Sequence, residues 1–152
     1  MGTFGAYLEQ MLLDSAFGKV AFTASTSLYI GLCTAAVNST STSITTEPST
    51  LTGYQRVAVT NTTTNWDLSE TSGAYSIKVN LSALTFPVVA GSSWPNVAYA
   101  FVCDTSSNLN FAATATSTQS GLYAWGALTA DKDLAVGDTA SFAASAFVIT
   151  LD

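Results

Sequence analysis

Histidine is absent from this sequence of 152 residues, and its cations are only Lys19, Arg56, Lys78 and Lys132. Without an imidazole, every nucleophilic triad that uses histidine as its base is excluded. Four scattered cations cannot neutralise a run of phosphates, so we expect no nucleic-acid partner. No apolar run reaches the ~18 residues that a membrane-spanning helix needs, so we expect no membrane partner either.

Cysteine is also scarce, and the two cysteines do not form a paired motif of the kind that binds zinc. Cys33 and Cys103 each lie within an apolar run, which favours two buried free thiols; a disulfide between neighbouring strands is the alternative. The N-terminus lacks a basic segment followed by an apolar core. We therefore expect the protein to be made and assembled in the cytoplasm.

Charged residues make up only 9% of the sequence, against roughly 25% in ordinary soluble domains. Serine and threonine fill the polar positions instead. A hydroxyl-rich surface with few lysines loses little rotamer entropy and little hydration of charge when another subunit covers it. The composition therefore favours a part of an assembly over a freely diffusing enzyme.

Asp131, Asp133 and Asp138 are the nearest approach to an acidic cluster. Their spacing matches no calcium-binding loop, so we interpret them as turn residues. No glycine-rich phosphate motif occurs. We therefore expect no catalytic, cofactor-binding or metal-binding residues.

Apolar residues near the N-terminus recur at the spacing of one helical face. They are Phe4, Tyr7, Leu8, Met11 and Leu12. This pattern predicts a helix over residues 3–17, with Thr3 capping its start and Gly18 ending it. We interpret residues 1–18 as a helical arm that either covers one end of a sheet or docks on a neighbouring subunit.

Residues 19–152 are predicted to form one β domain. Apolar and alternating runs predict strands over residues 27–34, 53–60, 76–81, 122–129 and 140–151, and a strand-turn-strand hairpin over residues 84–104. The segments 37–52 and 105–120 are rich in serine and threonine, and we predict a long exposed loop for the first and a small hairpin or flap for the second. Turns are predicted at residues 131–133 and 137–138. This order favours an antiparallel β-sandwich or jelly roll.

Five residues in or beside these strands invite a specific interpretation. Arg56, the only arginine, is predicted to hold a carboxylate or backbone carbonyls, with ligand binding as the alternative. Gly31 indicates a bulge or a close approach of another chain segment. The tryptophans, Trp66, Trp94 and Trp125, are interpreted as core residues, although tryptophan rings can also stack on sugars.

Several short motifs follow one another in a recognisable order. They are Tyr7-Leu8-Glu9 with Leu12-Leu13-Asp14, Leu28-Tyr29-Ile30-Gly31-Leu32, Gly53-Tyr54-Gln55-Arg56-Val57-Ala58-Val59, Leu84-Thr85-Phe86-Pro87, Trp94 with Val97, Gly126-Ala127-Leu128-Thr129, Val136-Gly137-Asp138-Thr139, Phe142 and Val148-Ile149-Thr150-Leu151-Asp152. Over nearly the whole chain this order resembles a family of small virion proteins of tailed bacteriophages, labelled tail-fibre-like or head-decoration proteins.

The resemblance implies a structural, non-enzymatic protein of a bacteriophage virion. We expect it to decorate or cement the capsid surface through contacts with the major capsid protein or other virion proteins, as a homo-oligomer such as a trimer. A tail fibre needs length or a repeat, and this sequence has neither. The alternatives are a protein of the tail tip or tail fibre, and a receptor- or carbohydrate-binding module. The N-terminal helix and the long loops are the predicted contact surfaces.

Overall fold

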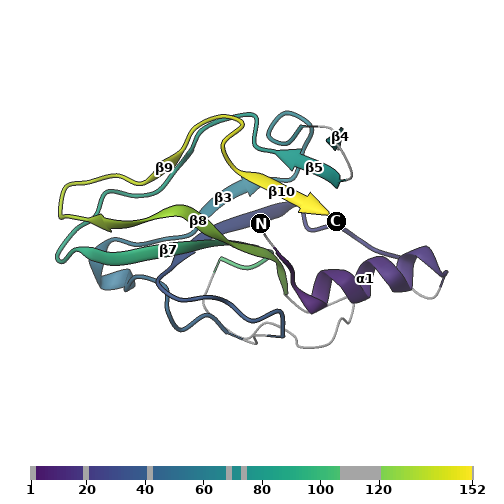
Figure 1. Cartoon of the computed structure of the whole chain (residues 1–152), viewed down its shortest axis with the longest axis horizontal. Coiled ribbons are helices and arrows are strands. Elements are labelled where there is room, and N and C mark those ends of the chain that lie inside the picture. Colours follow the sequence, from purple (N-terminus) through teal and green to yellow (C-terminus); the bar gives the residue numbers. More distant parts are fainter. Residues whose placement is uncertain are drawn as a thin grey trace.

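The computed structural model describes residues 3–18, 21–40, 43–67, 70–72, 75–106 and 121–151. Its strands are antiparallel, and one helix lies at one end of the elongated molecule (Figure 1). The predicted fold class, mainly β with a short N-terminal helix, is therefore confirmed. No helix in this part of the chain is long and apolar enough to cross a bilayer.

The largest sheet has five strands in the order β1-β8-β7-β2-β3. They are β1 (Thr3–Phe4), β2 (Ser27–Cys33), β3 (Val57–Thr60), β7 (Trp94–Cys103) and β8 (Leu122–Leu134). The central strand β7 places Phe101 opposite Gly31 of β2 and opposite Trp125 of β8. Strands β2 and β7 are mostly buried, as their continuous apolar runs predict.

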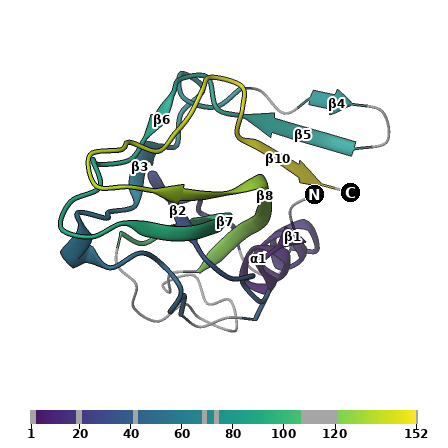
Figure 2. The ribbon, with the colours of Figure 1, turned by 60° about the vertical axis from the view of Figure 1, so that its left-hand side comes forward.

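Two smaller sheets cover one face of the five-stranded sheet (Figure 2). One has the order β10-β5-β4, with β4 (Glu70–Ser72), β5 (Tyr75–Val79) and β10 (Val148–Leu151). The other pairs β6 (Leu84–Thr85) with β9 (Ser141–Phe142). The result is a sandwich-like arrangement of layers around one apolar core.

The main core lies between these layers and is rich in aromatic side chains. Trp66 and Trp94 are each 1% exposed, which confirms the core interpretation for both. The indole nitrogen of Trp94 donates a hydrogen bond of 2.7 Å to the Thr52 hydroxyl, so its polar atom is satisfied inside the core. Thr52 belongs to a short 3-10 helix, η1 (Thr50–Thr52).

A second apolar cluster lies on the opposite face of the large sheet. Its buried members are Cys33, Val37, Ile44, Phe101, Cys103 and Leu122. The loop segments 34–40 and 43–49 supply Val37 and Ile44, which are 5% and 3% exposed. The prediction of a long loop over residues 37–52 is therefore confirmed in part: most of its described residues are exposed or half-buried, but Val37 and Ile44 are buried against the sheet.

The N-terminal helix is shorter than predicted. Helix α1 spans Ala6–Ala16, its N-cap is Gly5 rather than Thr3, and Thr3 instead pairs with Trp125 in strand β1. A Cβ atom at residue 5 would overlap the Leu122 carbonyl, so this position needs glycine. Gly18 follows the helix end with a φ of 73°, as predicted.

The predicted hairpin over residues 84–104 is also wrong. Strand β6 pairs with β9, and β7 pairs with β2 and β8, so the two halves of this apolar stretch belong to different sheets. Between them, Phe86 and Val89 are buried although they lie outside the strands. The density of apolar residues thus reflects a segment that crosses the core, which periodicity alone cannot distinguish from a strand pair.

Two further strand boundaries differ from prediction. Residues 131–133 lie inside β8 rather than in a turn, and Asp133 Oδ1 accepts a hydrogen bond of 2.7 Å from the backbone N–H of Asn96 at an irregularity of β7. The predicted last strand is divided into β9 and β10, with Ser145 between them at a φ of 61°. The turn at Gly137, with a φ of 96°, is confirmed.

The close approach predicted at Gly31 allows a test of how tightly β2 and β7 pack in the large sheet. A Cβ atom there would overlap the Phe101 ring, so Gly31→Ala should lower the free energy of unfolding by about 1–3 kcal/mol in urea denaturation. Phe101→Leu in the same chain should recover part of this loss by freeing space. Equal stability of Gly31→Ala and the native protein would show that this contact does not constrain the sheet.

Candidate functional site

The most organised polar group in the structure is a buried ion pair between Arg56 and Glu47. Arg56 Nε donates to Glu47 Oε1 at 2.9 Å, and Nη2 donates to Oε2 at 2.7 Å. The two side chains are only 2% and 6% exposed. This bidentate geometry is the strongest arrangement available to an arginine and a carboxylate.

Tyr54 extends the ion pair toward the sheet. Its hydroxyl donates to Glu47 Oε1 at 2.7 Å and accepts a hydrogen bond of 2.8 Å from the backbone N–H of Leu32. Burial, followed by the Glu47 charge, raises the pKa of Tyr54 well above its usual range, so this hydroxyl stays a donor. The group therefore joins a loop carboxylate to strand β2.

Arg56 also contacts strand β7 and the segment directly after it. Its Nη1 donates to the Thr105 carbonyl at 2.9 Å, and the guanidinium carbon lies 5.0 Å from the centre of the Phe101 ring. Burial alone would lower the pKa of Arg56, but the hydrogen bonds and charge of Glu47 raise it overall. The prediction that Arg56 holds a carboxylate and a backbone carbonyl is confirmed.

Both cysteines are free and buried, as predicted. Burial raises the pKa of Cys33 to about 12 and that of Cys103 to about 11, although the nearby Arg56 charge partly offsets the second shift. A thiol with so high a pKa is almost entirely protonated near neutral pH and is a poor nucleophile. Both cysteines pack in the second cluster, and Cys103 Sγ also accepts a hydrogen bond of 3.3 Å from Arg56 Nη1.

Two of the three acidic residues singled out above accept hydrogen bonds from the backbone. Asp138 Oδ2 accepts a hydrogen bond of 2.9 Å from the N–H of Ala135 across the turn at Gly137, while Asp133 holds Asn96. Asp131 is exposed. In the part of the chain that the structure describes, no three acidic or cysteine side chains gather as metal ligands.

Exposed apolar side chains gather toward the end of helix α1. Leu12, Leu13 and Phe17 are 39%, 59% and 83% exposed, whereas Tyr7 and Met11 of the same helix are buried in the main core. The helix therefore has one face packed on the sheet and one apolar group facing solvent, at one end of the molecule (Figure 1). We call Leu12, Leu13 and Phe17 the α1 patch.

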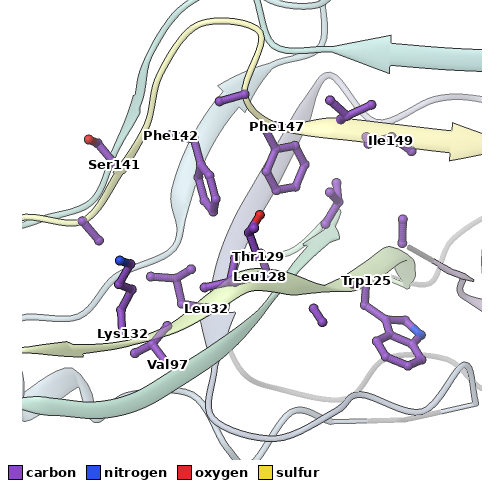
Figure 3. Close-up of a pocket in the computed structure, with 18 of the residues that line it drawn as sticks. Leu32, Val97, Trp125, Leu128, Thr129, Lys132, Ser141, Phe142, Phe147 and Ile149 are labelled. Carbon is purple, nitrogen blue, oxygen red and sulfur yellow. The ribbon is translucent and has the colours of Figure 1, made fainter. Parts of the chain in front are cut away.

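A groove of about 900 Å³ lies between β8 and the segment that carries β9 and β10. Phe142 and Phe147 project into it toward Leu128 of β8, while the Trp125 ring points away (Figure 3). That ring packs beside Tyr99 on the other face, with 6.4 Å between ring centres. We call this space, lined among others by Leu128, Lys132, Phe142, Phe147 and Thr150, the β8–β10 groove.

Sequence reasoning missed Glu47 and the groove, and it predicted the N-terminal helix as a contact surface without identifying Leu13 and Phe17. Glu47 lies in a hydroxyl-rich segment without periodic apolar residues, so only its being an isolated acid in such a segment pointed to a role. Leu13 and Phe17 lie off the predicted apolar stripe of the helix. Apolar residues outside that stripe indicate a second apolar face that the core does not bury. The predicted flap at residues 105–120 lies almost wholly outside the described residues.

Comparison with known proteins gives one clear finding. The model of the family described as "Podophage GP4 fiber I protein gp80" matches residues 3–150. The matched segment includes every helix and strand described above except the final residue of β10. A search of curated proteins finds no match.

The buried ion pair predicts a large and asymmetric effect of substitution. Arg56→Met leaves the Glu47 carboxylate buried without its partner and should lower the free energy of unfolding by about 3–5 kcal/mol. Arg56→Met combined with Glu47→Leu should lose less than the sum of the single substitutions. Urea denaturation measures both effects, and Lys132→Met, at an exposed lysine, is the control. Additive losses would contradict the coupling.

The buried thiols predict a loss of stability at alkaline pH. The pKa values of Cys33 and Cys103 are raised in the folded state from an ordinary value of 9.0, so the unfolded chain releases these protons first. Their contribution is fully present below pH 9.0 and is lost as the pH rises toward the folded values. The melting temperature should therefore fall above about pH 9, and Cys33→Ala should flatten this fall. An unchanged slope in Cys33→Ala would contradict the assignment.

Proposed function

The chain belongs to the family described as Podophage GP4 fiber I protein gp80, which makes it a structural protein of a phage virion, and from this premise we propose that it is a subunit of a phage fibre. The observation that carries the proposal is the family match over residues 3–150. We infer a purely structural role, without a catalytic step, for a protein assembled in the host cytoplasm and incorporated into the virion.

The size of the fold indicates how such a subunit would work. A compact domain of 152 residues has a radius of gyration of about 15 Å, so it cannot form an extended fibre by itself. A fibre made from it needs contacts between copies, or contacts with another virion protein. The function then lies in surfaces that bind other chains, and the low charge of this sequence lowers the cost of covering them.

The α1 patch is the first candidate for such a contact. Leu13 and Phe17 expose apolar side chains on a helix whose other face is fixed to the core by Tyr7 and Met11. A rigidly held apolar group loses little conformational entropy on binding, which favours affinity. The sequence predicts a symmetric homo-oligomer, with a trimer favoured, and this stays a prediction. The α1 patch would form a contact between the copies of such an oligomer.

Decoration of the capsid is the second candidate function, as an alternative to a fibre subunit. The major capsid protein would then be the partner. Capsid decoration is favoured by the same compactness, because the described residues form one layered β block without an internal repeat. A small rigid block can bridge capsid subunits and stabilise the assembled shell by binding to it. Binding to sugars gains no comparable support, since Phe17 alone is strongly exposed among the aromatic side chains whose burial the structure describes.

Electron microscopy of phage particles tests the location. Density matching the β sandwich in a fibre supports the proposal of a fibre subunit, whereas density on the capsid lattice supports capsid decoration. Absence of the protein from purified particles contradicts both. A particle population from which the protein has been genetically removed is the control, because the assigned density must disappear from it.

Substitution of the α1 patch tests the contact itself. Leu13→Ser and Phe17→Ser remove exposed apolar surface, so both variants should fold normally and be incorporated into particles at several-fold lower occupancy. Quantitative mass spectrometry of particles measures the occupancy. The matched control is Leu51→Ser, because Leu51 is 91% exposed and lies outside the patch. Full occupancy of both patch variants would contradict the assignment.

A further inference from the structure

The β8–β10 groove is a second apolar feature of the surface, separate from the α1 patch. Phe142, Phe147 and Leu128 face it, and each is only partly buried (Figure 3). The groove is recessed between the five-stranded sheet and the strands of the covering layer. Apolar surface of this kind gains free energy when a partner displaces water from it.

One wall of the groove carries an unpaired strand edge. Phe147 directs its backbone toward β5, because its carbonyl accepts from Asn80 N–H at 3.3 Å. Successive residues of a strand alternate sides, so Val148 and Thr150 direct their N–H and C=O groups away from β5. Within the described residues no strand pairs with this outer edge of β10. Open edges of this kind accept an added strand.

The charge of the groove is distinct from that of the chain as a whole. Lys132 is the only charged residue among those described that line the groove, although the formal net charge of the protein is −6. Its ammonium group lies toward the β9 end of the groove (Figure 3). The groove therefore favours an occupant with a negative group at this end.

We propose that the β8–β10 groove binds an extended segment of a partner polypeptide, which joins the outer edge of β10 as an added strand. Alternate apolar side chains of the segment pack on Phe142 and Phe147, and a carboxylate pairs with Lys132. The open edge supplies backbone hydrogen bonds and the groove supplies side-chain specificity, as in other cases of strand addition. This binding mode does not depend on whether the protein belongs to a fibre or to the capsid.

Two other occupants fit the geometry less well. A second folded copy would bring an edge strand held within its own sheet, and such a strand could extend β10 without entering the recess. A small polar ligand needs several converging polar groups, whereas the lining is mainly apolar and offers Lys132 as its only charge. A single extended segment satisfies both the edge and the recess.

Labelled peptides of nine residues provide the probe. The first alternates valine and threonine around a glutamate, the second replaces the glutamate by lysine, and the third carries N-methyl groups on the alternate amides that would pair with β10. Fluorescence anisotropy with the full chain should show saturable binding of the first peptide. The other two should bind about tenfold more weakly, because each loses a charge pair or backbone hydrogen bonds.

Substitutions in the protein test the same contacts from the other side. Thr150→Pro removes an N–H that points away from β5, so it should leave the β10-β5 pairing intact and weaken the first peptide about tenfold. Thr150→Ala is the matched control and should bind normally. Lys132→Glu should reverse the preference between the glutamate and lysine peptides. Circular dichroism and urea denaturation establish that each variant is folded.

Three results would overturn the proposal. The first is the absence of saturable binding for the glutamate peptide up to millimolar concentration. The second is equal affinity for the methylated peptide, or for folded Thr150→Pro, because binding would then not involve the strand edge. The third is self-association in sedimentation experiments that Thr150→Pro abolishes, which would make a second copy the occupant.

Discussion

The buried pair of Arg56 and Glu47 is the constraint on which the arrangement of the loops depends. Removing both charges from water is costly, and the cost is repaid only because the guanidinium meets a carboxylate, a carbonyl and an aromatic face at once. One side chain thereby fixes the loop that carries Glu47 and the segment directly after strand β7, at Thr105. A lysine could not satisfy these partners, because it lacks the planar fork of donors.

This anchoring explains how the large sheet can be buried on both faces. Regular strands cover one face, whereas the other is covered by a loop that contributes Val37, Ile44 and Glu47. Loops seldom cover a sheet, because their backbone polar groups need partners. Here the loop backbone finds some of them on the sheet: the N–H of Thr34, directly after β2, donates to the carbonyl of Thr46 at 3.0 Å.

Local sequence patterns predicted features that depend on one segment or one residue type. The buried strand β2, the close approach at Gly31 and the pairing of Arg56 follow from apolar runs, from a glycine within a strand and from a lone arginine among apolar neighbours. Pairings between residues distant in the sequence were not predictable. Thr3 lies in a strand because it pairs with the edge of β8, and residues 84–104 contribute strands to two different sheets. Of the site itself, Arg56 was foreseen without its partner Glu47, and the β8–β10 groove exists only once β8 and β10 are placed in space.

The loop over the second cluster also bears on how this protein can change over evolutionary time. Three of its side chains, those of Val37, Ile44 and Glu47, are buried against the sheet, while neighbouring hydroxyl residues such as Ser43 and Thr45 are exposed. Exposed serines and threonines can be exchanged at little cost in stability, whereas the three anchors cannot. The fold thus separates a few side chains that hold the loop on the sheet from an outer surface that tolerates substitution with little loss of stability.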